Sequence, residues 1–235
     1  MATVTQIANR VSRTTGWATT AATTERDMVL EFLNEIYQDA CDRTECTKTT
    51  SASADLTAGT WQYTLASSPF SLSNISRIES VYGNDNFKLE EKSAPWLREQ
   101  RSGYSPSSER PVYYSTPAPG TIWFHPPPSS GSTIEIDYLK TPLVLVESGA
   151  SANVSESTPT AFPSRFHFSI LSNGAIAMAL DGDQRKDSGP WWERYEIAVD
   201  KLSTWVQEYG GLNFVQPHFG SNNYRHSTDR SVDLP

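Results

Sequence analysis

Histidines, paired carboxylates and cysteines are the residues of this chain that could carry chemistry, and their spacing decides what they can do. The four histidines are scattered, at His125, His167, His218 and His226. None stands in an H-E-x-x-H pair or at another spacing that would bring two imidazoles onto one metal ion. His167 lies among aromatic residues in a predicted helix, so we expect a core side chain. His125 precedes three prolines, and we expect it in a loop.

The carboxylates do not form a recognisable site either. Asp181, Asp183 and Asp187 superficially resemble a calcium loop, but they lack the central spacing and the closing glutamate of an EF-hand. The sequence does not place a further carboxylate at the separation from the Glu90–Glu91 pair that a glycosidase needs. Nucleophile-elbow, P-loop and dinucleotide-binding motifs are absent from the sequence. The sequence therefore predicts no catalytic residue, metal or cofactor and a protein that is not an enzyme; a hydrolase site assembled from scattered residues is the alternative.

Residues 88–110 are locally basic and carry interleaved rings. Their members are Lys88, Lys92, Trp96, Arg98, Arg101, Tyr104 and Arg110. One interpretation is a patch that follows a phosphate backbone. The favoured one is a mixed-charge surface, because four acidic residues share the span. The whole chain has a formal charge of -8, whereas sequence-specific nucleic-acid binding needs a basic surface.

The fraction of apolar residues is low for a chain of 235 residues. Hydrophobic residues make up 37% and the mean hydropathy is -0.49, yet there are 7 Trp, 10 Tyr and 9 Phe. Either these rings fill a small core, or some of them pack against other chains. Cys41 and Cys46 are expected on different faces of one helix, without a disulfide, which fits a reducing compartment. The sequence shows neither a signal peptide nor a membrane-spanning run, so no membrane partner is expected.

Apolar residues recur with a helical period in the N-terminal part of the chain. A short helix is predicted over residues 3–13, ended by Gly16, and a longer one from Thr24 to near Thr47. A polar linker, Lys48–Ser53, would follow. The apolar face of the longer helix is expected to hold Val29, Phe32, Leu33, Ile36, Tyr37 and Ala40.

Two further helices are predicted near the C-terminus. Pro163 opens the first, and Gly174 within it would permit close helix approach. Pro190 lies in the first turn of the second. Their inner faces are expected to hold Phe166, Ile170, Leu171, Ala177, Met178, Trp192, Tyr195, Val199, Leu202, Val206 and Tyr209. The polar stretch 146–160 is expected to lack structure.

Between these helices the hydrophobic period changes from 3.6 to 2. Short strands with turn signals between them predict a small antiparallel sandwich or barrel. The predicted strands are 61–65, 75–82, 112–115, 121–125 and 133–139, with a helical turn over 93–100.

Helices far apart in sequence must meet to bury their apolar faces, which predicts the α+β class. The expected architecture is a helical bundle of one N-terminal and two C-terminal helices, with an inserted antiparallel β-sandwich or barrel-like module and an extended C-terminal arm. The expected parts are residues 1–50 and 146–211 for the bundle, 51–145 for the β-rich module and 212–235 for the arm. Three aromatic residues in a polar tail favour an arm that orders on a partner.

This order of motifs resembles the head-to-tail adaptor (connector) proteins of tailed bacteriophages. The resemblance is carried by phrases in a fixed order and spans about residues 24–209. These phrases are VLEFLNEI (29–36), DLTAGTWQYTL (55–65), ISRIESVY (75–82), RPVYY (110–114), TIWFHPP (121–127), IEIDYLKTP (134–142) and the helix 161–180.

The resemblance implies a virion protein at the head–tail junction. Such proteins form a homo-oligomeric ring, commonly of about twelve copies, below the portal protein. The ring extends a channel through which double-stranded DNA passes without sequence-specific binding, and tail components attach to it. The docking arm would use Phe214, Phe219, Tyr224, Arg225 and His226. The bundle and its interfaces would use Phe32, Ile36, Phe166, Ile170, Trp192, Tyr195, Val199 and Trp205.

Two other functions stay open at this point. One is a tail-tube or gatekeeper component one layer lower, which would bind the tail side and not the portal. The other is a free-standing β-sandwich that binds glycan or protein. Its ring platforms would be Trp96, Tyr113 and Trp123.

Overall fold

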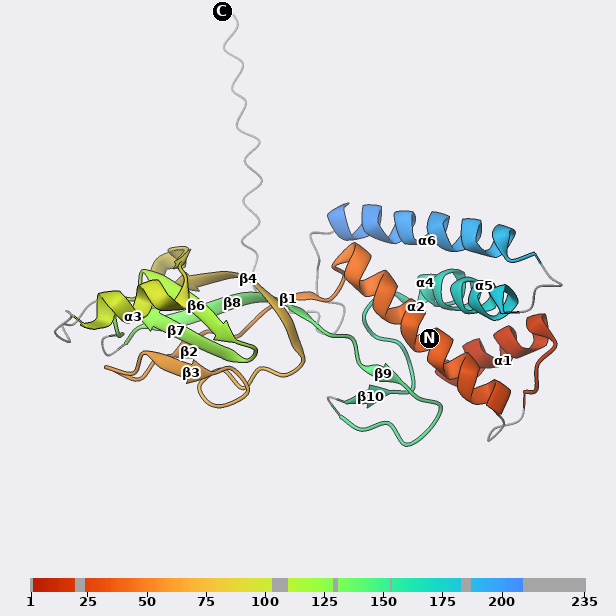
Figure 1. Ribbon diagram of the computed structural model, residues 1–235, viewed down its shortest axis with the longest axis horizontal. Coiled ribbons are helices and arrows are strands. Elements are labelled where there is room, and N and C mark those ends of the chain that lie inside the picture. The colour runs from red at the N-terminus through yellow and green to blue at the C-terminus, as the bar shows by residue number, and fades with distance from the viewer. Residues whose placement is uncertain are drawn as a thin grey trace, which may run out of the picture.

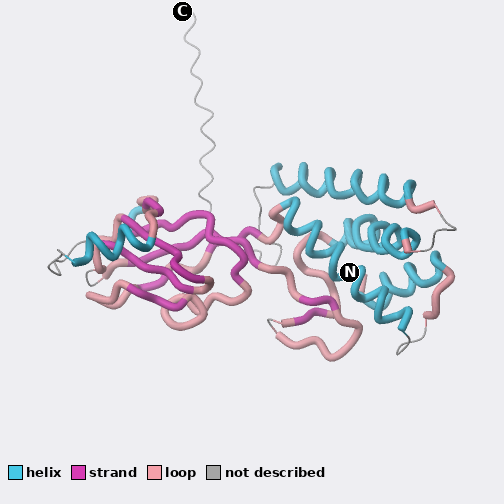
Figure 2. The backbone as a smooth tube through the Cα atoms, in the orientation of Figure 1, coloured by secondary structure: helices cyan, strands magenta, loops and turns pink. Residues whose placement is uncertain are grey.

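The computed structural model describes residues 2–19, 24–102, 110–128, 131–152, 154–182 and 187–208. The molecule is elongated, with most helices at one end and most strands at the other (Figure 1). Colouring by secondary structure shows the same division (Figure 2). The chain starts among the helices, crosses to the strand-rich end and returns, so the α+β class is confirmed.

The N-terminal helices follow the predicted pattern. Helix α1 (Val4–Thr15) begins with a capping box between Thr3 and Gln6 and ends at Gly16, which adopts a left-handed conformation. Helix α2 (Thr24–Thr44) ends earlier than predicted, because Glu45 takes a positive φ of 52° and turns the chain.

The early end of α2 corrects the prediction for the cysteines. Cys46 lies in the turn beyond the helix rather than on another helical face. Its Sγ is 3.7 Å from the Sγ of Cys41, and both are buried free thiols. Burial raises the pKa of the Cys41 thiol.

The first sheet is built around β8 (Thr133–Lys140). Strand β4 (Ile75–Gly83) pairs antiparallel along one side of β8, while β1 (Lys48–Thr50) and β2 (Ala54–Asp55) pair with the other side. The predicted linker Lys48–Ser53 is therefore wrong: its β-branched threonines continue directly into the sheet. The outgoing strand β1 and the returning strand β8 are hydrogen-bonded to each other.

The second sheet has the order β3–β7–β6–β5. The expected strands near 61–65, 112–115 and 121–125 all lie in it, and β5 pairs parallel with β6. The helical turn predicted at 93–100 is confirmed as helix α3, which contacts β6 and β7. The bounds are β3 (Gln62–Thr64), η1 (Asn84–Asn86), β5 (Glu90–Glu91), α3 (Ala94–Ser102), β6 (Tyr113–Ala118) and β7 (Thr121–His125).

The two sheets share one core of apolar side chains. Alternation along β8 points Ile134, Ile136 and Tyr138 into it, where they join Tyr63, Tyr114, Ile122 and Phe124 of the second sheet. No sheet among the described residues closes into a barrel, so the barrel-like part of the expectation is wrong.

The C-terminal helices complete the helical end. The predicted helix after Pro163 is one helical stretch with a π-helical turn inside it: α4 (Ser164–His167), η2 (Phe168–Ser172) and α5 (Asn173–Asp181). Helix α6 (Gly189–Glu208) packs on α5, α2 and η2. The stretch 146–160 is not structureless, because β10 (Ser155–Glu156) pairs parallel with β9 (Val144–Leu145).

Candidate assembly surfaces

The residues predicted for the bundle lie in the helical core or at its edge. Ile36, Phe166, Ile170, Tyr195 and Val199 are buried there, and Phe32, Trp192 and Trp205 are partly buried against it. The Trp205 ring contacts Phe166 at a centroid distance of 6.3 Å, and Phe32 contacts Trp17 at 6.2 Å. These side chains pack within one subunit, and their role between subunits stays a prediction.

The helices approach most closely where Gly174 of α5 meets Ile36 of α2. A Cβ atom at Gly174 would lie 2.6 to 2.9 Å from three side-chain carbons of Ile36. Only a glycine permits this distance, as the sequence predicted. The same core contains His167, whose Nε2 is 3.1 Å from the carbonyl oxygen of Phe162. Burial lowers the pKa of His167, and the expectation of a core histidine is confirmed.

A polar clamp ties α2 to α6. The Arg43 guanidinium donates to both carboxylate oxygens of Glu196, at 3.0 and 2.6 Å. The Tyr195 hydroxyl donates to Asp39. The hydrogen bonds from Arg43 lower the pKa of Glu196, while burial and the Asp39 contact raise the pKa of Tyr195. The clamp orients the two helices without a site for chemistry.

A second clamp ties α2 to the stretch that precedes α4, and sequence reasoning missed it. Arg26 is 2% exposed and forms an ion pair with Glu147. The Tyr37 hydroxyl donates to Glu156 Oε1 at 2.6 Å. A signal was present: Arg26 falls three residues before Val29, on the apolar stripe of its own helix, where an arginine needs a buried partner.

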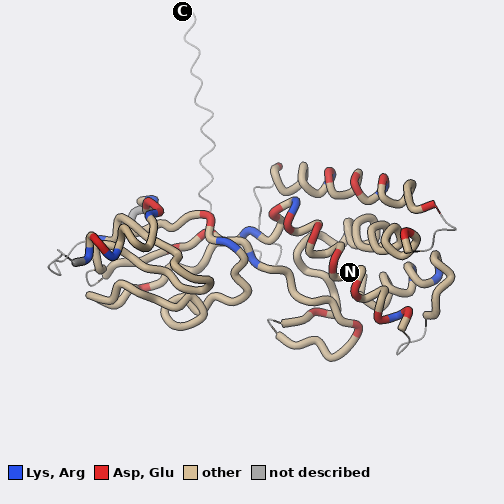
Figure 3. Tube along the Cα trace, viewed as in Figure 1, with Lys and Arg blue, Asp and Glu red and all other residues tan. Residues whose placement is uncertain are grey.

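The outward face of α2 is acidic. Asp27, Glu31, Glu35 and Asp39 recur every four residues, are exposed, and lie opposite the buried Leu33 stripe. Figure 3 shows these acidic positions along α2 and others along α6. Among the described residues no three potential metal ligands gather, and no described helix is long and apolar enough to cross a membrane.

One family matches this chain, over both the helical end and the strand-rich insert. It is the family described as SU10 adaptor protein, and the match covers residues 2–215. The chain belongs to the SU10 adaptor family. No curated protein matches the chain. Membership makes it a phage adaptor protein, a virion component of the head–tail junction that associates with portal and tail components, and confirms the resemblance drawn from the order of motifs.

Part of the arm lies within the family match but outside the described residues. The docking residues expected in this SU10-family chain, Phe214, Phe219, Tyr224, Arg225 and His226, all follow Glu208, the last described residue. Tyr209 also lies outside the described part, as does Asp183. Their roles stay predictions.

The basic segment of this adaptor stacks on rings of the second sheet. Arg101 lies 3.8 Å from the centroid of the Trp61 ring, and Arg98 lies 5.0 Å from that of Trp123. The two tryptophans contact each other at 4.8 Å. Both arginines are exposed, so their guanidinium edges are available to a carboxylate or phosphate group of a partner.

The same geometry argues against glycan platforms on this adaptor. Trp123 is only 6% exposed, and Trp96 is occupied by Tyr113, at 5.0 Å, and by Lys92. An open ring face, which a sugar needs, is therefore missing at Trp123. His125 ends β7 and is buried beside Trp96, so its predicted loop position is wrong.

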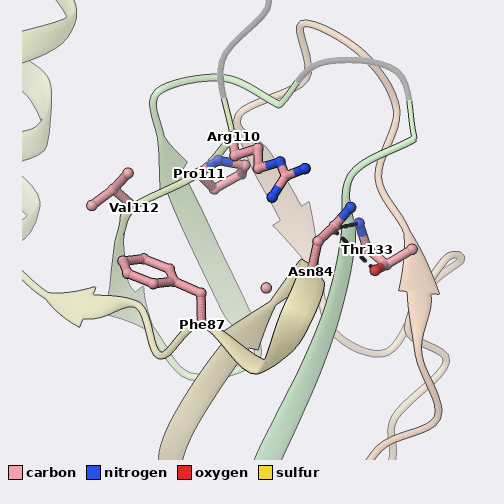
Figure 4. A pocket seen from close by; sticks show the side chains of 7 residues that line it. Asn84, Phe87, Arg110, Pro111, Val112 and Thr133 are labelled. Carbon is pink, nitrogen blue, oxygen red and sulfur yellow. Dashed lines mark hydrogen bonds between the residues drawn. The ribbon is translucent and has the colours of Figure 1, made fainter.

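A cavity of about 490 Å³ opens at the end of β4 in the adaptor's strand-rich part. Figure 4 shows Arg110 and Asn84 beside it, with the Phe87 ring on the other side. Asn84 Oδ1 accepts from the backbone nitrogen of Thr133 at 2.6 Å and from its hydroxyl at 3.0 Å. Among the described residues, the lining includes the Phe87 ring, Pro111 and Val112, so this part of the cavity is suited to holding an apolar group.

Proposed function

We propose that this protein forms a homo-oligomeric ring, of about twelve copies, that docks below the portal. The ring extends the channel for double-stranded DNA and provides the platform on which tail components attach. The observation that carries this proposal is the family match over residues 2–215. This match includes both the helical part and the strand-rich part of the molecule. The role is structural and not enzymatic.

The charge of the chain supports passage of DNA without binding. A copy carries a formal charge of -8, and each copy in a ring adds the same charge to the field around the channel. Tight binding to the phosphate backbone needs the opposite sign. Genome DNA would therefore slide through the ring during packaging and ejection.

The helical and the strand-rich parts of the molecule have different roles in this proposal. We assign ring formation to the helical bundle, residues 1–50 and 146–211, and contact with tail components to the inserted β-rich module, residues 51–145. Its exposed features support this assignment: Arg98 and Arg101 on their rings, and Phe87 at 53% exposure beside the cavity.

The arm, residues 212–235, is assigned to docking on the portal or a neighbouring subunit. Deleting it is expected to leave the fold intact, because the described helical core is complete by Val206. Portal binding is expected to be lost. The test compares full-length and truncated protein in sedimentation with purified portal, with circular dichroism as the folding control.

Each result of that comparison has a defined meaning. Truncated protein that binds portal as well as the full chain refutes the role of the arm. Truncated protein that no longer folds makes the tail a core element instead. A full-length protein that ignores the portal but binds tail proteins places it one layer lower in the tail.

A further inference from the structure

Arginines on one side of the helical end lie on aromatic rings without a carboxylate partner. The guanidinium of Arg10 on α1 is 5.3 Å from the centroid of Phe168. That of Arg165 on α4 is 4.8 Å from the Phe166 ring and 5.3 Å from the Trp205 ring of α6. Within the described part of the chain, neither arginine forms an ion pair.

Helix α6 extends this surface. Arg194, Lys201 and Trp205 recur at intervals of seven and four residues, so they share one side of the helix. Arg194 also lies over a ring, 4.9 Å from the centroid of Trp191. We call the surface formed by Arg10, Arg165, Arg194, Lys201, Phe168 and Trp205 the arginine face. Phe168 and Trp205 are only partly buried, so apolar and cationic groups are exposed together.

A row of exposed carboxylates on α2 and two carboxylates on α6 lie on the other side. On α2 they are the exposed carboxylates that recur every four residues, opposite the stripe that packs on α5 and α1. On α6 the acidic side holds Glu196 and Asp200, one turn apart, and Glu196 reaches across to Arg43 of α2. We call the surface formed by Asp27, Glu31, Glu35, Asp39, Glu196 and Asp200 the acidic face.

The bundle therefore has two sides of opposite charge. Helix α6 shows this within one element, because its acidic side meets α2 whereas Trp205, on its cationic side, meets Phe166 of α4. Carboxylates four residues apart on a helix repel one another, and exposed guanidiniums can donate hydrogen bonds to a carboxylate of another chain. Asp39 and Glu196 already pair with Arg43, so Asp27, Glu31, Glu35 and Asp200 are the carboxylates that the arginine face could pair with.

We infer that the arginine face of one copy binds the acidic face of the next copy. This inference rests on the proposed ring. A ring needs a heterologous interface, in which two different patches on separate sides of the subunit meet and the rotation closes. Complementary charge fixes the register of such a contact, and the half-exposed rings of Phe168 and Trp205 supply its apolar part.

The competing use of the acidic face is the lining of the DNA channel. A row of carboxylates would repel the phosphate backbone, which also suits a channel. The arginine face decides between the two uses. If the acidic face pointed into the channel, it would not be available to pair with the cationic side of a neighbouring bundle.

Charge reversal on each face provides the test. One variant carries Arg10→Glu, Arg165→Glu, Arg194→Glu and Lys201→Glu, so both of its faces are acidic. The second carries Asp27→Arg, Glu31→Arg, Glu35→Arg and Asp200→Arg, so both are basic. Each alone is expected to lose ring formation on the portal by more than about tenfold, because like charges then meet at every contact. A one-to-one mixture is expected to restore rings, since each variant complements the other in alternation.

The measurement is the number of copies bound per portal, by native mass spectrometry at low and high salt. Arg98→Glu with Arg101→Glu is the matched control, because these arginines also stack on rings but belong to the strand-rich end. The control is expected to form rings. Circular dichroism melting of every variant separates failed assembly from failed folding.

The outcomes separate this inference from the proposed function. A wild-type protein that binds no portal refutes the proposed function itself. Wild-type rings together with normal rings of both variants overturn the inference alone. So does a mixture of two folded variants that fails to assemble. An acidic-face variant that forms complete rings but slows DNA passage shows that this face lines the channel.

Discussion

Replacing Gly174 with alanine tests the packing of α5 on α2. Two effects of opposite sign compete at this position. Alanine in a helix interior is more favourable than glycine by about 0.8–1 kcal/mol. The new Cβ would lie 2.6, 2.8 and 2.9 Å from Cδ1, Cγ2 and Cγ1 of Ile36. The two Cγ atoms belong to a stiff β-branched side chain, so Ile36 cannot move aside by rotating its far end alone.

Overpacking of this kind costs about 1–3 kcal/mol. With the helix-propensity gain subtracted, Gly174→Ala is expected to lower the free energy of unfolding by about 1 kcal/mol. In an Ile36→Ala background the three contacting carbons are gone. The same glycine replacement is then expected to stabilise the protein by about 1 kcal/mol, which gives a coupling of about 2 kcal/mol.

The assay is urea unfolding of the four proteins of this cycle, followed by the helical circular dichroism signal. The reversal of sign between the two backgrounds is the diagnostic result, because Ile36→Ala alone also costs about 2–5 kcal/mol through the cavity it leaves. Stabilisation by Gly174→Ala of similar size in both backgrounds would refute the close approach of the two helices.

Three other substitutions test the interior. Arg26→Met is expected to cost about 3–5 kcal/mol of stability, because it leaves the Glu147 carboxylate without its ion-pair partner. The double variant Arg26→Met with Glu147→Leu should recover most of this loss in thermal melts. No recovery would refute the buried pair. The pKa of His167 is lowered by burial, so its contribution to stability is complete above the unfolded pKa of about 6.5 and is lost as the pH falls toward the lower folded value. The melting temperature should therefore fall over that window in the wild type and less in His167→Gln; equal falls contradict this. Trp205→Ala should cost about 2 kcal/mol, less than the 3–5 kcal/mol of a fully buried ring, because Trp205 is only partly buried; an unchanged melt would mean that its contact with Phe166 contributes nothing.

Periodic segments were predictable from the sequence, and pairings between distant short segments were not. The apolar stripe of α2 and the alternation of β8 follow from local spacing alone. Strands β1, β2, β5 and β10 have two or three residues each, too few to show a period. Their partners lie far along the chain, as in the pairing of Lys48 with Leu139, so tertiary context decides them.

The candidate surfaces were predictable only in part. The aromatic residues of the bundle were identifiable because their spacing places them on helical inner faces. The close approach at Gly174 was predictable from a small residue on such a face. The stacking of Arg101 on Trp61 was not, because the two residues are 40 positions apart and meet only through the second sheet. The separation of charge in the bundle also depends on which side of α6 meets α2.

Imaging of the protein mixed with its cognate portal by electron microscopy tests the central claim most directly. A second ring stacked below the portal, with the strand-rich modules attached to a ring of helical bundles, is the result that the adaptor account predicts. A bare portal at micromolar protein concentration, with the protein still folded by circular dichroism, would contradict it.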